Sequence, residues 1–446
     1  MNPNSNESRC TSCHAGYGWK DDSFDFSRLE NIDCLVCHDT TGKYTKTPTG
    51  AGMPDPDIDL AQIARNVGPT SRETCGSCHF SGGGGDHVKH ANMGSELNDP
   101  CRTCDIHMGG YDFTCTECHR TTNHKIPGKS SSVAATEGTT QCIDCHTKEP
   151  HYGNDLLDHH LNEHCDHIAC NTCHSPLYAR SHPTKIWWDW SEAGDTDRPV
   201  QKGPHGQPLY HWKKGVFGWT QNAKPSYAWS NGYTQRTLAG DTVDLEGKIV
   251  DPDASQKEKK QGDYVHLASP VGDKTDPDSK ITPFKVMRGV QPADPETSLL
   301  LLPHLFPYGQ EDTTAYWKNL DWQKAFEEGM QASGLPYSGD YVWVRTDMYW
   351  RMEHEVLPKE GALKCTQCHS ALQGEKTCDR CHRPARAADF TDLMQGGERM
   401  QSAEDSGWDP KHLEKKSDFL NFKDLGYEGD PIIHGGRFKR LPLSFE

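Results

Sequence analysis

One short cysteine–histidine motif accounts for most of the chemistry that this sequence could do. The chain has 446 residues, with 19 cysteines and 25 histidines. The pattern Cys-x-x-Cys-His occurs eight times, beginning at Cys10, Cys34, Cys75, Cys115, Cys142, Cys170, Cys365 and Cys378. Two thiols at this spacing can bond the vinyl groups of one porphyrin, and the histidine that follows can bind its iron as the proximal ligand. The pattern therefore predicts eight covalently attached haems of the c type.

The predicted attachment residues are the two cysteines and the histidine of each motif. A Cys-x-x-Cys pair can also form half of a zinc site, but zinc sites do not require a histidine directly after the second cysteine. Such a histidine follows in every copy, so zinc does not explain the set. The residues are Cys10, Cys13 and His14; Cys34, Cys37 and His38; Cys75, Cys78 and His79; Cys115, Cys118 and His119; Cys142, Cys145 and His146; Cys170, Cys173 and His174; Cys365, Cys368 and His369; and Cys378, Cys381 and His382.

Other histidines are available to bind the opposite face of each iron. An iron with two histidine ligands conducts electrons but offers no free position to a substrate. Eight of the 25 histidines belong to the motifs, so 17 remain. We expect seven of these to be distal ligands: His90, His107, His124, His151, His160, His164 and His354. In this interpretation His159 and His167 are surface residues or alternative ligands.

The segment after the third motif has a different character. Residues 80–90 read FSGGGGDHVKH. Consecutive glycines let the backbone approach a planar group closely, and Asp86 and Lys89 share one face if a helical turn begins there. A buried lysine beside iron would lose its proton and could act as a sixth ligand that exchanges more readily than histidine. A solvated surface lysine is the alternative interpretation.

The composition favours a fold organised around prosthetic groups. Hydrophobic residues are 33% of the chain, glycine and proline number 41 and 28, and the mean hydropathy is −0.83. So polar a chain would be weakly folded by itself, whereas each porphyrin supplies a large apolar plate. We therefore expect a mainly α fold with extensive coil, packed irregularly around haems.

The spacing of the motifs predicts three regions. Residues 1–182 hold six motifs, including that of the second haem, residues 183–360 hold none, and residues 361–446 hold the last two. The middle region is rich in tryptophan, tyrosine, glycine and proline. We expect its aromatic residues to wrap haem edges rather than to form a substrate or partner surface. Residues 315–331 have an amphipathic helical pattern, with Trp322, Ala325, Phe326 and Met330 on one face.

Charge and hydropathy limit the partners. The net charge of −17 argues against binding nucleic acid or an anionic membrane surface. No stretch approaches the ~20 apolar residues of a spanning helix, so we expect no transmembrane segment. The opening residues MNPNSNESRC lack the basic and apolar regions of a signal peptide. Because haem c is attached outside the cytoplasm, we expect a mature or trimmed chain in the periplasm or the cell exterior.

Several segments resemble the octahaem tetrathionate reductase family. They are CTSCHAGYGWKDDSFDF, NIDCLVCHDTTGKY, CGSCHFSGGGGDHVKH, FTCTECHRTTNHKIPG, PTKIWWDWSEAG, ITPFKVMRG and MYWRMEHEVLPKEGALKCTQCH. The resemblance extends over essentially the whole chain. It implies that the second haem, held by Cys34, Cys37 and His38, is catalytic, with Lys89 as its distal ligand and Asp86 beside that lysine.

Three cysteines outside the motifs depart from that family. They are Cys101 and Cys104, in the sequence CRTCD, and Cys165. We expect Cys101 and Cys104 to form a disulfide, either with each other or with Cys165, because an oxidising compartment favours pairing. A ninth haem site without a proximal histidine is the alternative. Three cysteines cannot all pair within one chain, so one is free or bridges two subunits.

Two functions are compatible with these features. The first is a reductase of small oxyanions of sulfur or nitrogen, with tetrathionate, nitrite and hydroxylamine as candidate substrates and a cytochrome or quinol-linked donor. Lys89 would then supply positive charge, and Asp86 would hold its amine or relay protons. The second is a non-catalytic electron-transfer protein, which could assemble into a conducting chain or filament outside the cell. Oligomerisation is compatible with both functions.

Overall fold

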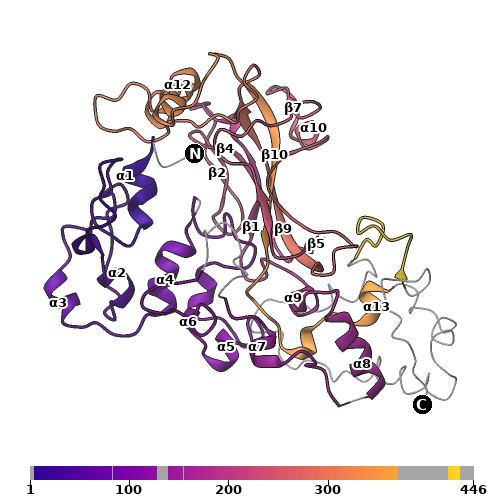
Figure 1. Cartoon of the computed structure of the whole chain (residues 1–446). Coiled ribbons are helices and arrows are strands. Elements are labelled where there is room, and N and C mark those ends of the chain that lie inside the picture. The colour runs from indigo at the N-terminus through magenta and orange to yellow at the C-terminus, as the bar shows by residue number, and fades with distance from the viewer. Residues whose placement is uncertain (1–4, 83, 128–138, 154, 370–419, 432–446) are drawn as a thin grey trace.

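The fold is described by a computed structural model of the chain (Figure 1). Its described residues are 5–82, 84–127, 139–153, 155–369 and 420–431. The eighth motif, with Cys378, Cys381 and His382, lies outside these ranges. Within them, no helix is both long enough and apolar enough to cross a membrane.

A ten-stranded mixed sheet forms the centre of the molecule (Figure 1). Its strands follow the order β2-β3-β4-β1-β9-β10-β8-β6, while β5 pairs with β9 and β7 with β10. The bounds are β1 (Thr184–Asp189), β2 (Gln201–Lys202), β3 (Pro208–His211), β4 (Gly215–Thr220), β5 (Ser226–Ser230), β6 (Thr234–Arg236), β7 (Ile249–Val250), β8 (Val265–Pro270), β9 (Lys280–Ala293) and β10 (Val342–Arg351).

The expectation of a mainly α fold was wrong. The long strands β9 and β10 pair antiparallel without a break from Val342↔Ala293 to Arg351↔Phe284. Their sequences, KITPFKVMRGVQPA and VWVRTDMYWR, are rich in the β-branched and aromatic residues that suit a pleated, buried surface. The sequence interpretation assigned the aromatic residues of this region to haem edges, and so it missed the sheet that they build.

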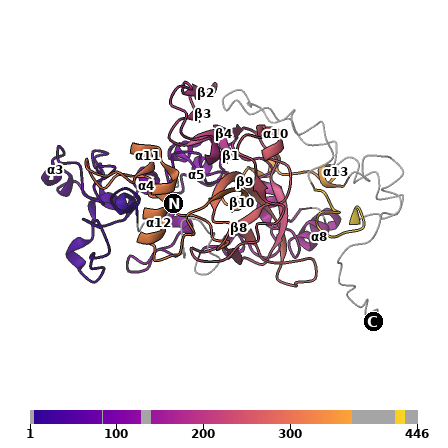
Figure 2. The ribbon, with the colours of Figure 1, turned by 90° about the horizontal axis from the view of Figure 1, so that it is seen from above.

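The helices are short and most lie in the motif-bearing segments. They are α1 (Glu7–Cys10), α2 (Leu35–His38), α3 (Leu60–Ala64), α4 (Arg72–His79), α5 (Met108–Tyr111), α6 (Cys115–Cys118), α7 (Ile143–His146), α8 (Asp155–His164), α9 (Cys170–His174), α10 (Gln256–Lys259), α11 (Tyr316–Asn319), α12 (Trp322–Ala332) and α13 (Cys365–Cys368). In Figure 1 α1 to α3 lie beside the sheet, α4 to α9 lie along its lower end, and α12 lies at its upper end. Figure 2 shows α3 and α13 at opposite ends of the molecule, with the sheet between them.

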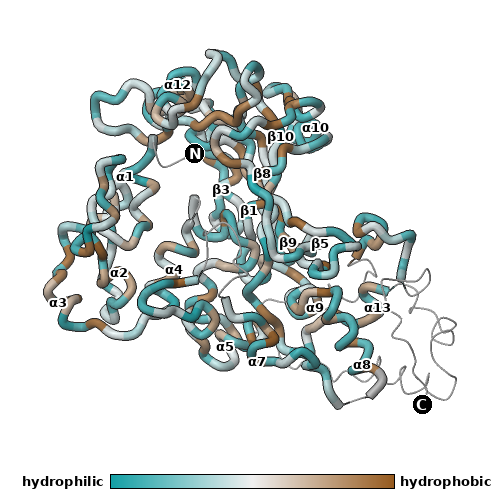
Figure 3. Tube along the Cα trace, in the orientation of Figure 1, coloured by the Kyte–Doolittle hydropathy of each residue, from teal (hydrophilic) through white to brown (hydrophobic). Residues whose placement is uncertain are grey.

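The helix expected over residues 315–331 is present but is divided in two. Leu320 adopts a left-handed conformation with φ of 57° and ends α11, and the Asp321 side chain then accepts a hydrogen bond from the Lys324 amide to begin α12. On α12 the side chains of Ala325, Phe326 and Met330 are buried, as their spacing predicts. Figure 3 shows further hydrophobic residues along the strands and beside α12.

The N-terminal segment is attached to the sheet-bearing region through a buried histidine. His304 Nδ1 donates to the Ser5 carbonyl oxygen at 2.6 Å, and its Nε2 lies 2.7 Å from Asp312 Oδ2. The Asn6 side-chain oxygen accepts from the amides of Leu305 and Phe306. These contacts join residues almost 300 positions apart and fix where the first motif begins.

Candidate haem sites and the lysine segment

Each described motif forms about one turn of helix that ends near its histidine. In the second motif, α2 spans Leu35–His38, and the ring of His38 donates from Nδ1 to the Gly68 carbonyl oxygen at 2.8 Å. In the seventh motif a carboxylate restrains the ring instead, because His369 Nδ1 lies 2.8 Å from Asp430 Oδ1. A partner on Nδ1 fixes the ring and leaves Nε2 to bind a metal.

The described motifs form a continuous series of neighbours in space. Close electrostatic interactions connect the thiols of neighbouring motifs, and the first, second and fourth motifs all neighbour the third. These interactions join Cys13 to Cys78, Cys37 to Cys75 and Cys78, Cys75 to Cys115, Cys118 to Cys145, Cys142 to Cys170, and Cys173 to Cys365 and Cys368. Groups attached at these thiols would therefore lie close to one another from the first motif to the seventh.

Four motif histidines face another histidine at a separation that fits an iron between them. Two imidazoles bound to opposite sides of one iron would have ring centroids about 6 Å apart, since a metal–nitrogen bond is about 2 Å. The observed centroid separations are 6.2 Å for His38–His124, 5.9 Å for His146–His107, 6.5 Å for His119–His354 and 6.2 Å for His369–His164. The residues present thus fit haem groups with two axial histidines.

The other three expected distal histidines have less direct geometry. His90 interacts electrostatically with His79 and packs edge-on against Trp350 at 5.1 Å. His151 interacts with His174, and its Nδ1 lies 3.1 Å from Asn162 Oδ1. His160 lies half-exposed on α8, with Nδ1 3.1 Å from Glu163 Oε2. Their roles as ligands stay predictions.

The glycine-rich segment places Lys89 in a partly buried environment. Gly84 and Gly85 have φ of 120° and 133°, a left-handed region that glycine tolerates best. Lys89 Nζ lies 5.8 Å from the centre of the Trp350 ring, and burial lowers the pKa of its amine. Asp86 is oriented elsewhere, because it accepts a hydrogen bond from the Ser95 amide at 3.0 Å. Lys89 and Asp86 therefore have different partners in this structure.

Lys285, on β9, holds the segment that carries Lys89. Its Nζ donates to the carbonyl oxygens of Val88, Lys89 and His90 at 3.0, 2.9 and 3.2 Å, and to Thr184 Oγ1 at 2.7 Å. Lys285 is fully buried, and burial followed by the charges of neighbouring lysines lowers its pKa. The sequence interpretation gave it no role. Its position in the otherwise apolar run ITPFKVM was the available signal, since a lysine is seldom fully buried without partners.

A second strand lysine lies among aromatic rings near the same segment. Lys185 Nζ, on β1, lies 3.7 Å from the centre of the Phe217 ring and 4.0 Å from that of Trp188. Burial, and then the charges of Lys214 and Lys89, lower the pKa of Lys185 to about 6. Three lysines therefore approach residues 85–91 from β1, from β9 and from the segment itself.

The structure brings His124, rather than Lys89, into contact with His38. Their rings are 6.2 Å apart and nearly perpendicular, at 74°. Among the described residues, no hydrogen bond, ion pair or ring contact joins Lys89 to His38. Two side chains are therefore candidates for the sixth position at the haem of Cys34: Lys89 by resemblance, and His124 by geometry.

The cysteines outside the motifs are partly paired. Cys101 and Cys104 form a disulfide, as expected for the local pairing. The Arg180 guanidinium donates to the carbonyl oxygens of Thr103 and Cys104 and so ties this loop to the start of the sheet region. Cys165 keeps a thiol, which lies 3.4 Å from the Leu161 carbonyl oxygen.

Comparisons with known proteins agree with this arrangement of motifs and sheet. Residues 185–372 match a family described as bacterial cytochrome c. The structure is similar to that of an octaheme cytochrome c from Shewanella oneidensis, with 41% sequence identity, a TM-score of 0.72, and coverage of 83% of this chain and 79% of that chain. An uncharacterized protein of Archaeoglobus fulgidus is 28% identical over an alignment of 149 residues, and the match covers 29% of this chain and 50% of that relative.

Proposed function

We propose a reductase function from the premise that this chain belongs to the octahaem c-type cytochromes, which bind haem c covalently. In this proposal eight haems are attached, and small anions of sulfur or nitrogen are reduced beside Lys89. The observation that carries it is the convergence of Lys89, Lys185 and Lys285 on one segment of a chain whose net charge is −17. Lys285 holds the segment in place, whereas the amines of Lys89 and Lys185 have no evident use in a protein that only conducts electrons.

The haems, when bound, would supply one-electron storage and transfer along the series of motifs. The chain contributes the spacing, because the thiols of neighbouring motifs are in contact or close interaction from Cys13 to Cys365. It also contributes four pairs of histidines, each of which would hold an iron on both sides. Electrons would come from a cytochrome or a quinol-linked donor in the periplasm or at the cell exterior.

The lysines would bind an anion and take up protons with it. Burial lowers the pKa of Lys89, Lys185 and Lys285, so these amines release a proton more readily than exposed lysines do. A nearby negative charge raises the pKa of an amine, because it stabilises the protonated form. An entering dianion would therefore favour the ammonium forms of Lys89 and Lys185, and their protons would be available to a reaction that consumes them.

Tetrathionate is the simplest substrate for such a site. Its central S–S bond breaks on addition of two electrons, which gives two thiosulfate ions and consumes no proton. Nitrite and hydroxylamine reduction consume protons, which Lys89 and Asp86 would have to relay from solvent. The dependence of rate on pH therefore separates these substrates.

Electron transfer without catalysis is the second candidate function. It is favoured by the position of His124 across from His38 at 6.2 Å. If His124 binds the iron at Cys34, that iron has two histidine ligands and no position for substrate. Assembly of several chains would then extend the series of haems.

Three variants distinguish the two functions. We expect Lys89→Ala to convert one haem from low to high spin in electron paramagnetic resonance spectra and to reduce tetrathionate turnover at least tenfold. Lys89→Arg should not restore it, because a guanidinium keeps its proton and cannot bind iron. Lys274→Ala is the control, since its amine donates to the Gly426 carbonyl oxygen and lies far along the chain from the motif at Cys34.

His124→Ala gives the opposite test. If His124 is the sixth ligand of the haem attached at Cys34, that haem becomes high-spin in His124→Ala, and Lys89→Ala keeps the spectrum and the turnover rate of the parent protein. That pair of results would refute catalysis at a lysine-bound haem. The intact mass should exceed the 49.9 kDa polypeptide by eight haems, and a smaller excess would refute the haem count.

A further inference from the structure

A compact group of metal-binding side chains lies beside the lysine segment and is used by neither candidate function. His87, Glu96 and His182 each offer one nitrogen or oxygen atom, and these atoms all lie within 4.8 Å of one another. His87 Nε2 is 3.2 Å from Glu96 Oε2 and 3.4 Å from Asp86 Oδ2. The group thus combines two imidazoles with one or two carboxylates.

The backbone around this group is fixed from several directions. His87 has a left-handed φ of 57°, and its carbonyl oxygen accepts from the Lys185 amide at 3.0 Å and from Thr184 Oγ1 at 2.8 Å. Ser95 holds the Asp86 carboxylate through its amide. These hydrogen bonds hold residues 86–96 against the start of β1. None of them is a contact between the side chains of the three candidate ligands.

The geometry argues against two other uses of the histidines. The His87 and His182 ring centroids are 5.1 Å apart, closer than the 5.9 to 6.5 Å of the four pairs that fit an iron between them. They also differ from the structural His304, whose two ring nitrogens both have protein partners within 2.7 Å.

The charge of Glu96 calls for a nearby cation. Its side chain is 11% exposed, and its Oε2 atom is buried with no hydrogen-bond partner among the described residues. A buried carboxylate is costly unless it is protonated or paired with a positive charge. A neutral imidazole supplies no such charge, whereas a divalent cation between the ligands would.

We propose that His87, Glu96 and His182 bind one Zn²⁺ ion, with Asp86 or water as the fourth ligand. Zinc sites with two histidines and one glutamate leave the fourth position open, and nitrogen and oxygen ligands at about 2.1 Å suit this ion. Ligand atoms on such a tetrahedron are about 3.4 Å apart, a separation that His87 and Glu96 already have. The ion would tie residues 86–96 to the start of β1 and so fix the segment that carries Lys89.

The test uses the haem-loaded protein, dialysed against a chelator and then titrated with zinc in a metal buffer. We expect one zinc per chain by elemental mass spectrometry, and an anomalous peak at the zinc edge between His87 and His182 in crystals. Loss of an outer partner of a metal ligand typically weakens binding 10- to 100-fold. His182→Ala and Glu96→Gln should therefore weaken zinc binding at least about 100-fold.

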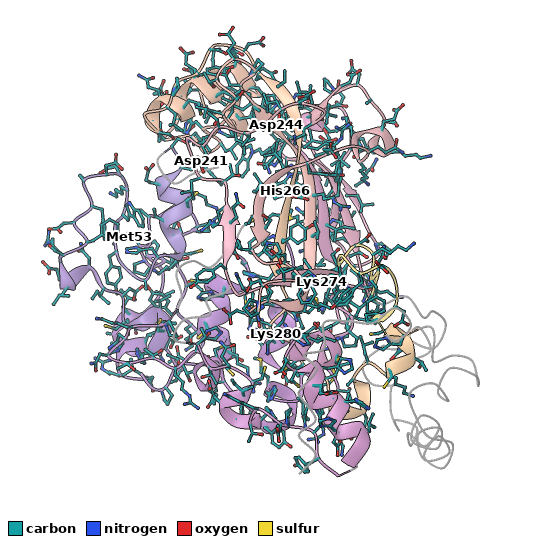
Figure 4. The ribbon with its side chains drawn as sticks, turned by 45° about the vertical axis from the view of Figure 1, so that its right-hand side comes forward. Met53, Asp241, Asp244, His266, Lys274 and Lys280 are labelled. Atoms are coloured by element: carbon teal, nitrogen blue, oxygen red, sulfur yellow. A yellow bond between two sulfur atoms is a disulfide. The ribbon has the colours of Figure 1, made fainter. Side chains whose placement is uncertain are left out.

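His266→Ala is the matched control. His266 is also a histidine paired with a carboxylate, at 2.6 Å from Asp347 Oδ1, but it lines a separate pocket with Asp244 on the sheet (Figure 4). We expect this variant to bind zinc as the parent does. Equal zinc binding by the parent, His182→Ala and Glu96→Gln would overturn the proposal.

Two further readouts keep the result interpretable. The low-spin haem spectrum should be unchanged in His182→Ala, and loss of a low-spin signal would mean that His182 binds iron, which also overturns the zinc assignment. If a variant does not fold, the zinc-edge map of the parent protein decides alone. Because zinc content is measured without turnover, the site can be present even if catalysis at Lys89 is refuted.

Discussion

Residues 183–360 form the sheet-bearing region, and residues before 183 form the motif-bearing region. The two regions are stabilised in different ways. Strands β1 to β10 and α12 enclose side chains that are almost completely buried, including Tyr316, Phe326 and Val344. Tyr316 stacks on Trp322 with ring centroids 3.5 Å apart. By contrast, ten of the 16 large hydrophobic residues that are exposed in the described part of the chain lie before residue 182. The first region has an ordinary side-chain core, and the second leaves much of its apolar surface open.

The difference is explained by what each region has to pack against. Phe26 is 67% exposed, yet its ring lies 6.3 Å from His14 and 4.9 Å from Trp19. Aromatic residues that surround a motif histidine are positioned to cover a haem attached there. Burial of apolar surface stabilises by about 25 cal/mol per Å² whichever partner covers it. The motif-bearing region therefore depends on its haems for stability, and the sheet does not.

Preventing haem attachment should give the largest effect. Produced without attached haem, the chain should lose amide protection throughout residues 5–182, while β9 and β10 remain protected. Hydrogen–deuterium exchange of the haem-free and haem-loaded proteins measures this directly. Equal loss of amide protection in both regions would contradict the view that only the motif-bearing region depends on haem, because the sheet would then also need the haems.

Phe326→Ala should give the next largest effect, and it acts on the sheet-bearing region. The side chain lies on α12 and is completely buried in contact with the rings of Trp322 and Tyr341, and removing such a phenylalanine typically costs about 3–5 kcal/mol. We expect chemical denaturation of the haem-loaded protein to show a loss of about that size in the free energy of unfolding.

Phe26→Ala is the matched control for that substitution. It should change the free energy of unfolding of the haem-free chain very little, since the ring is exposed there, and should shift the spectrum of the haem at Cys10 once haem is attached. A loss as large in the haem-free chain as that caused by Phe326→Ala would show that Phe26 belongs to a side-chain core.

The junction between the two regions should weaken in acid. Burial acts to raise the pKa of Asp312, but hydrogen bonds from His304 and from three backbone amides outweigh it and hold the pKa well below its ordinary value. The stabilisation is therefore complete above the ordinary carboxyl pKa and is lost as the pH falls toward the lowered one. Asp312→Asn should cost about 2 kcal/mol at pH 7. The difference from the parent should shrink below pH 4, and a constant difference would contradict this assignment.

The sequence predicted the parts of the molecule that depend on local spacing. The buried face of α12 follows from residue order alone, and a disulfide in the CRTCD segment was expected, although the sequence left open whether its partner was local or Cys165. The ten-stranded sheet was missed because aromatic residues in β1 and β10 suit a strand and a haem edge equally well. Periodicity could not decide between them, since strands buried on both faces do not alternate.

The residues around Lys89 were predictable from the sequence only in part, again because the sheet was missed. Lys89 and Asp86 attracted attention through their glycine-rich context, whereas Lys285 and His182 come from segments about 100 or more residues away from it. Their contribution depends on how β9 and β1 approach residues 86–96. That approach is a property of the sheet, so an interpretation without the sheet could not place them.

The disulfide should have the smallest effect, and it tests whether the motif-bearing region has any stabilisation of its own. Cys101 and Cys104 close a loop with a sequence separation of 3, and the entropy of so short a loop corresponds to about 2 kcal/mol. The double substitution Cys101→Ser, Cys104→Ser should lower the free energy of unfolding by about that amount in the haem-loaded protein and leave the mass of bound haem unchanged. Arg180 would still donate to the carbonyl oxygen of residue 104, so the loop should keep its position. Loss of one haem would instead identify Cys101 and Cys104 as a haem attachment site. The motif-bearing region would then depend on haem even where the described part of the chain forms a disulfide.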